Sequence, residues 1–84
     1  MNNEIIIYIT PTCPYCHAAK QLLNSKGQDY TEIRVDTDPQ LRQEMMQKSD
    51  RTSVPQIFIG DQHIGGFDDL NALNRAGKLD ALLN

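Results

Sequence analysis

Cys13 and Cys16, the two cysteines of the chain, are the residues whose type and spacing most directly suggest chemistry. A disulfide between residues this close would shut a very small loop, so it would restrict little of the unfolded chain's conformational entropy. Such a pair in a cytosolic protein is more typical of redox chemistry or metal binding than of structural cross-linking. The sequence therefore indicates that the function resides at these two thiols.

The residues around Cys13 predict that it lies at the start of a helix. Pro14 suits the first helical position, where a missing N–H is not needed. The sulfur of Cys13 would then face the unpaired N–H groups of Tyr15 and Cys16 and the positive end of the helix dipole, which favours the thiolate. Cys16 would lie one turn into the helix and more buried. We therefore expect Cys13 to attack a disulfide and Cys16 to resolve the product.

The charge pattern around the cysteines supports a thiolate. No acidic residue occurs from position 5 to position 28, whereas Lys20 and Lys26 belong to the helix that follows Cys13. Nearby cations stabilise a thiolate relative to the thiol. The sequence thus predicts an electropositive surrounding for the nucleophile.

Zinc binding is the competing chemistry for the cysteine pair. A structural zinc site needs four ligands, and His17 and His63 are the other candidates considered. His17 adjoins Cys16 and would point around the helix as a solvent-facing residue. His63 alternates with Ile64 in a predicted strand and is interpreted as a surface residue. The ligand set is incomplete, so we expect no metal.

Two further segments allow both a structural and a functional interpretation. Residues 53–55 (Ser-Val-Pro) precede a strand; they either start it with an ordinary trans bond or leave the Val54 backbone open to an extended peptide. Residues 65–69 (Gly-Gly-Phe-Asp-Asp) form either a capped turn or a carboxylate site at a helix N-terminus. In the second case, Asp68 could hold an amine.

Hydrophobic patterning predicts the elements that position these residues. A β-branched run at 4–9 is typical of a strand buried on both faces. Spacing and caps predict helices at about 14–26 and 39–48, and a third from 68 that is interrupted at Gly77. Further strands are expected at 30–35, 56–59 and 62–65, the last two joined by a tight Gly60-Asp61 turn. The order β-α-β-α-β-β-α predicts an α/β fold, a mixed four-stranded sheet with three to four helices.

Length, charge and hydropathy exclude several classes of protein. The 84 residues allow a single domain, 1–84. A net charge of −3 without clustered Lys or Arg argues against nucleic-acid binding. No apolar stretch approaches the roughly 20 residues of a membrane-spanning helix. The N-terminus lacks the positive region of a signal peptide, so we expect a cytoplasmic protein without membrane contact.

Three segments in this order resemble the dithiol glutaredoxins of small bacterial type: Thr12-Cys13-Pro14-Tyr15-Cys16, Ser53-Val54-Pro55 and Gly65-Gly66-x-Asp68. The resemblance extends over nearly the whole chain. It implies a thioredoxin fold, a monomer, and a thiol–disulfide oxidoreductase with glutathione as reductant. The implied substrates are proteins with disulfides or with glutathione attached, and ribonucleotide reductase is one candidate at the level of the family.

The resemblance also implies residue roles. Cys13 would be the nucleophile and Cys16 the resolving thiol, while Gly66, Phe67 and Asp68 would hold the γ-glutamyl end of glutathione. Residue 67 would contribute through its backbone. The implied glutathione-binding set is Thr12, Tyr15, Ser53, Val54, a cis Pro55, Gly66, Phe67 and Asp68.

The chain departs from the family pattern at three positions. Thr10 stands where many glutaredoxins have a lysine, Ser53 replaces a threonine, and Phe67 occupies a position that is often a third cysteine. The absent lysine keeps open a thioredoxin-like electron carrier reduced by a flavoprotein, although residues 65–68 disfavour it. A further alternative is an iron–sulfur scaffold in which two chains share a cluster through Cys13 and two glutathiones, which Pro14 disfavours.

Overall fold

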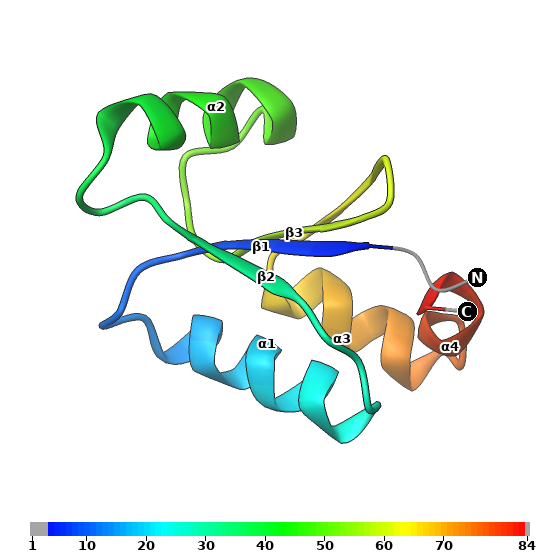
Figure 1. Ribbon diagram of the computed structural model, residues 1–84. Coiled ribbons are helices and arrows are strands. Elements are labelled where there is room, and N and C mark those ends of the chain that lie inside the picture. Colours follow the sequence, from blue (N-terminus) through cyan, green and yellow to red (C-terminus); the bar gives the residue numbers. More distant parts are fainter. Residues whose placement is uncertain (1–3, 84) are drawn as a thin grey trace.

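A central sheet of four strands separates helices on its two sides in the computed structural model, which describes residues 4–83 (Figure 1). The strands are β1 (Ile5–Ile9), β2 (Thr31–Arg34), β3 (Gln56–Ile59) and β4 (Gln62–Gly65). The helices are α1 (Pro14–Ser25), α2 (Pro39–Ser49), α3 (Phe67–Arg75) and α4 (Leu79–Leu83). The expected order is confirmed, and the C-terminal helical region is divided around Gly77. No helix within residues 4–83 has the length and apolar character needed to cross a membrane.

The strand order β2-β1-β3-β4 places β1 and β3 at the centre of the sheet. β1 and β2 are parallel, so α1 must cross over between them, whereas β3 pairs antiparallel with both β1 and β4. The chain leaves β1 at its carboxyl end and reaches α1 after a four-residue loop at 10–13. This connection brings the start of α1, and with it Cys13, to the end of the sheet at which β1 terminates.

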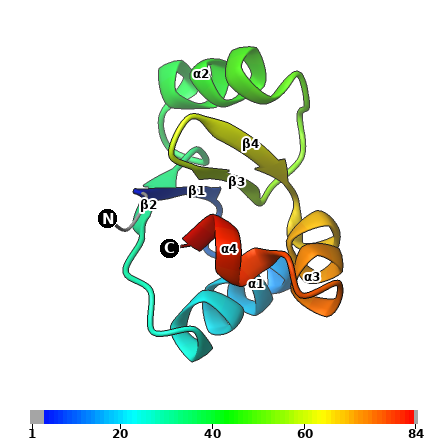
Figure 2. The same cartoon turned by 90° about the vertical axis from the view of Figure 1, so that its right-hand side faces the viewer.

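The two faces of the sheet are covered unequally. Helices α1, α3 and α4 pack on one face and α2 lies alone on the other (Figures 1 and 2). Successive residues of β1 point to opposite faces, which gives Ile7 to the first layer and Tyr8 to the second. The prediction that β1 is buried on both faces is therefore confirmed. The larger core consists of Ile5, Ile7, Ile9, Cys16, Ala19, Leu23, Ile57, Ile59, Leu70, Leu79 and Leu83.

A candidate dithiol active site at the start of the first helix

Cys13 is the N-cap of α1, as predicted. Its backbone is extended (φ −96°, ψ 111°), and Pro14 follows in the first turn. The Cys13 Sγ accepts a hydrogen bond from the backbone N–H of Cys16, with an N–S distance of 3.2 Å. The first turn of α1 carries no acidic residue. A sulfur takes the place here of the oxygen that usually caps a helix, so negative charge on it is stabilised by the cap contact.

Cys16 is fully buried in the larger core, whereas Cys13 is half-buried; both thiols are free. Burial raises the pKa of Cys16 to about 12, and a hydrogen bond and charge interaction with Cys13 act in the same direction. The backbone of Thr10 and the charge of Lys20 lower the pKa of Cys16 by smaller amounts. Cys16 therefore keeps its proton as long as Cys13 is in its reduced form. This property suits Cys16 to act after Cys13.

Lys20 of α1 and Lys26, the C-cap of that helix, are less available to the site than the sequence indicates. Lys20 Nζ lies 2.8 Å from Glu32 of β2, and Lys26 Nζ lies 3.1 Å from Asp80 of α4. Glu32 holds the pKa of Lys20 above its usual value, chiefly through this hydrogen bond. The positive charge of the acid-free segment 5–28 is thus partly neutralised by carboxylates that other elements bring close to its lysines.

A groove of about 180 Å³ lies beside the nucleophile. The Cys13 thiol donates to the backbone carbonyl of Val54 over 3.8 Å, which places the groove loop against the dithiol. The Val54–Pro55 peptide bond is cis, as the resemblance implies. The groove is lined by Tyr15, Arg51, Ser53, Val54, Pro55, Gly66, Phe67, Asp68 and Asp69.

The groove brings together every residue of the implied glutathione-binding set except Thr12. Thr12 is exposed and is not among the lining residues. Two lining residues, Arg51 and Asp69, do not belong to the implied glutathione-binding set, although Asp69 lies in the segment 65–69 for which a carboxylate site was one interpretation. Asp69 is the third residue of α3, so the capping-box spacing from Gly66 is a signal that could have identified it. Arg51 carries no comparable local signal.

Arg51 and Asp69 connect the two sides of the groove. Arg51 Nη1 lies 2.9 Å from Asp69 Oδ2, and the same oxygen accepts a hydrogen bond from Gly66 N over 3.1 Å. The Arg51 guanidinium, followed by the Gly66 N–H, lowers the pKa of the Asp69 carboxyl. We call these three residues the clamp, because Asp69 joins the loop before β3 to the turn before α3.

Phe67 lines the groove, and its side chain contacts that of Tyr15. Its ring is stacked with that of Tyr15, with centroids 6.3 Å apart and planes inclined by 26°. Tyr15 stays 62% exposed, whereas Phe67 is half-buried against the larger core. Both rings belong to residues that line the groove, and a backbone contact of residue 67 with glutathione stays a prediction.

The two histidines lie in different surroundings. His17 is exposed, as expected, with Nε2 3.2 Å from the Pro11 carbonyl oxygen. The surface interpretation of His63 is wrong: it is half-buried, its Nε2 lies 2.8 Å from Gln56 Oε1, and its ring packs against Phe58. Burial, and then the charge of Arg51, lower the pKa of His63. Within residues 4–83 no group of three or more His, Cys, Asp or Glu is placed to hold a metal ion.

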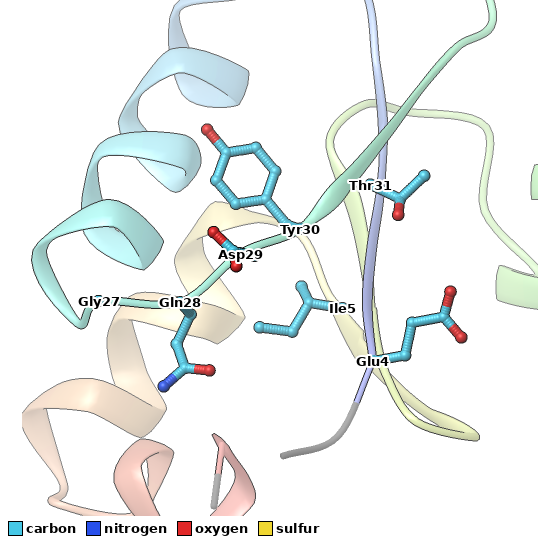
Figure 3. Close-up of a pocket in the computed structure, with 7 residues that line it drawn as sticks. All are labelled: Glu4, Ile5, Gly27, Gln28, Asp29, Tyr30 and Thr31. Carbon is cyan, nitrogen blue, oxygen red and sulfur yellow. The ribbon is translucent and has the colours of Figure 1, made fainter.

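A second cavity, of about 320 Å³, is larger than the groove but contains no cysteine (Figure 3). It is formed by the beginning of β1 and the segment 27–31 that follows α1, and the Tyr30 side chain projects toward that helix. The 12 residues of α1 span about 18 Å, and Cys13 lies at the other end. This cavity is therefore separate from the dithiol site.

A CxxC dithiol presented by the crossover helix of a parallel β-α-β unit defines a thiol–disulfide protein of the thioredoxin fold. Within that class, the chain belongs to the glutaredoxin family, whose model matches residues 5–64. Membership carries the general activity of the family, which is thiol oxidoreduction that depends on glutathione.

Two bacterial glutaredoxins are similar in sequence to this chain over almost its full length. The chain is 59% identical over 80 residues to a glutaredoxin of Pseudomonas aeruginosa, covering 95% of each chain. It is 57% identical to glutaredoxin 3 of Escherichia coli K12, covering 95% of this chain and 96% of the relative.

Solved structures show the same similarity. The solution structure of a Brucella melitensis glutaredoxin superposes with a TM-score of 0.87 at 52% identity, covering 98% of this chain and 89% of the other. The crystal structure of a buckwheat glutaredoxin–glutathione complex superposes with a TM-score of 0.89 at 31% identity, covering 96% and 76%.

Proposed function

We propose that this chain reduces protein disulfides and protein–glutathione mixed disulfides through the dithiol of Cys13 and Cys16, with glutathione as the reductant. The observation that carries the proposal is the asymmetry of the two thiols. Cys13 caps α1 beside a groove, whereas Cys16 is fully buried and its pKa is raised to about 12. Nucleophilic attack by one thiol and delayed attack by the other follow from that difference.

In the first step, the Cys13 thiolate attacks one sulfur of the substrate disulfide, and the other sulfur leaves as a thiolate. The product is a mixed disulfide on Cys13. Loss of the Cys13 charge removes the charge interaction and the hydrogen bond that help to keep Cys16 protonated. Cys16 then loses its proton and attacks Cys13, which releases the second substrate thiol and leaves the Cys13–Cys16 disulfide.

The groove is proposed to bind glutathione while Cys13 reacts. Val54 would pair with the peptide backbone, and Gly66, Phe67 and Asp68 at the start of α3 would hold the γ-glutamyl end. Support comes from the groove beside Cys13 and from the buckwheat relative, whose structure is a complex with glutathione. Asp68 is exposed and can offer a carboxylate to an ammonium group. Tyr15 would flank the bound tripeptide.

Redox potentials support glutathione as the electron donor in the proposed cytoplasmic setting. Glutaredoxin couples lie at about −200 to −230 mV, and the cytosolic glutathione couple lies at about −220 to −260 mV by extraction. A gap of about 30 mV corresponds to about 1.4 kcal/mol for two electrons. Glutathione can therefore return the oxidised site to the dithiol, and each cycle consumes two glutathione molecules.

The first test is coupled turnover of a glutathionylated protein. Glutathione with glutathione reductase should support multiple turnovers, whereas thioredoxin reductase without glutathione should support none. Turnover with thioredoxin reductase alone would favour a thioredoxin-like carrier. Position 10 is consistent with that alternative, because it is a threonine where many glutaredoxins have a lysine. Absence of turnover in both systems would contradict the proposed activity.

The cysteine variants test the division of roles. Cys13→Ser should abolish both reactions, because a hydroxyl is not ionised at neutral pH, while serine still caps the helix. Cys16→Ser should retain reduction of the glutathione mixed disulfide and lose most protein-disulfide reduction. Thermal unfolding of both variants checks that they are folded. Equal loss in both reactions for both variants would contradict the assignment.

A further inference from the structure

Tyr15 and Phe67 form an aromatic wall along the groove. Tyr15 lies in the first turn of α1 and Phe67 is the first residue of α3, so the wall bridges the two helices that flank the groove. The rings are stacked at 6.3 Å with an interplanar angle of 26°. Tyr15 is the one large hydrophobic residue that stays exposed, at 62%, among the residues described.

The wall is held in place before a substrate arrives. Phe67 packs against the larger core, so its ring has a fixed position, and Tyr15 rests on that ring. Binding to a preorganised surface costs less conformational entropy than binding to mobile groups, because the groups of the surface are already ordered. The exposed part of Tyr15 can therefore be covered by a partner ring at a small entropic cost.

The groove offers little else that discriminates between neutral peptides. Arg51, the cation among its lining residues, is already paired with Asp69 at 2.9 Å. Aromatic rings favour offset-stacked and edge-to-face contacts, which the wall can provide to a third ring. Contact with an aromatic side chain is thus the selective interaction that the wall can supply close to Cys13.

We propose that the aromatic wall selects protein disulfides in which an aromatic residue adjoins the attacked cysteine. The inference rests on the proposed dithiol function and specifies its substrates. Cys13 attacks one sulfur of such a disulfide and expels the partner thiolate. Cys16 then attacks Cys13 and releases the second thiol, so the substrate gains two electrons and the protein ends as the Cys13–Cys16 disulfide.

The test is oxidation of the reduced protein by symmetric peptide disulfides, without glutathione. One peptide has glycine on both sides of its cysteine, and two others carry a tryptophan immediately before or after it. Rates are measured by acid quenching and chromatography under single-turnover conditions. We expect at least one tryptophan peptide to react about three- to tenfold faster than the glycine peptide.

Variants isolate the wall from the intrinsic reactivity of the peptides. Phe67→Ser should reduce the tryptophan-to-glycine rate ratio to nearly that of the uncatalysed thiol exchange. Tyr30→Leu, which removes a ring from the cavity at the other end of α1, should leave the ratio unchanged. A general loss of stability slows both peptides alike, so the ratio responds to selection.

Each outcome of the test is informative. If no peptide disulfide oxidises the protein, the proposed dithiol function itself is wrong. If all peptides react and the ratio matches that of free thiols, the function survives and the aromatic selection is refuted. A peptide with leucine beside its cysteine that gains as much as the tryptophan peptide would likewise refute a selection for aromatic residues.

Discussion

The starts of α1 and α3 flank the same groove but use their N-terminal N–H groups differently. At α1, the cap is the Cys13 sulfur, and no acidic residue lies in the first turn. At α3, the cap position is Gly66, and the first turn contains Asp68 and Asp69. Asp69 fills the role of a capping carboxylate by accepting from Gly66 N over 3.1 Å. One helix start thus leaves its positive end to a reactive sulfur, and the other is neutralised by its own side chains.

This difference explains how one small groove can serve two purposes. A positive helix end stabilises a thiolate when no carboxylate competes for it, which is the condition at Cys13. At α3, Asp69 already provides the capping charge, so the neighbouring Asp68 is left exposed as a negative group on the groove. We infer that the start of α1 supplies the nucleophile and that the start of α3 supplies the charge for recognising the γ-glutamyl end of glutathione.

The largest expected effect on this comparison comes from Gly65→Ala, which alters the entry into α3. Gly65 has φ +119°. An added Cβ would collide with the Asp69 carboxylate and would lie 3.0 Å from Arg51 Nη1. We expect a loss of about 2–4 kcal/mol in the free energy of unfolding, because backbone strain adds to disruption of the clamp. Urea denaturation measures this loss.

Gly77→Ala is the matched control. Gly77 also has a positive φ, +74°, but a Cβ there would meet nothing within 4 Å. Gly77→Ala should lower the free energy of unfolding by only about 1–2 kcal/mol, which is the cost of placing alanine in the left-handed conformation. Equal losses in the two variants would mean that Asp69 moves aside freely and that the clamp does not constrain the α3 entry.

A smaller effect is expected from Asp68→Asn, which removes the proposed recognition charge. The KM for glutathione should rise about two- to fivefold with kcat nearly unchanged, because an exposed ion pair contributes at most about 1 kcal/mol. Steady-state kinetics with a glutathionylated substrate provide the measurement. Asp61→Asn makes the same charge change in the β3–β4 turn and should leave the KM unaltered. A similar rise in both variants would assign the effect to net charge.

Most of the fold could be predicted from the sequence, because its signals are local. The bounds of β3 and β4 agree with the prediction, since the hydrophobic runs end at a Gly-Asp turn. Pro14 and Pro39 mark the first residues of α1 and α2. The predicted cap at Cys13 is confirmed for the same reason, because Pro14 fixes the position at which α1 begins.

The missed features depend on contacts between distant segments. Arg51 meets Asp69 across 18 positions, and Glu32 reaches Lys20 from β2. No periodicity or cap signal encodes such pairs, so the positive surrounding of Cys13 was overestimated and the clamp was not seen. His63 was misinterpreted because strand alternation does not reveal that Gln56 and Phe58 of the adjacent strand cover it.

The smallest expected effect concerns the pH dependence of the clamp. The pKa of Asp69 is lowered in the folded chain, first by Arg51 and then by the Gly66 N–H. A carboxyl whose pKa falls on folding stabilises the protein above its unfolded pKa, about 3.9, and loses that contribution as the pH drops through its folded pKa. The Asp69 side chain is 46% exposed, so solvent screening limits the contribution at neutral pH to about 0.5 kcal/mol.

Asp69→Asn isolates this contribution, since the amide oxygen can still accept from Gly66 N but carries no charge. The stability difference between the natural chain and Asp69→Asn should be constant from about pH 5 to 7 and shrink toward zero below about pH 4. Asp36→Asn is the control: Asp36 also pairs with an arginine, Arg34 at 2.7 Å, and its pKa is lowered too, but it lies outside the groove. Only the Asp69 variant should raise the KM for glutathione, because only its carboxylate joins the two sides of the groove. Equal KM values in the two variants would reduce the clamp to an ordinary surface ion pair that takes no part in glutathione binding.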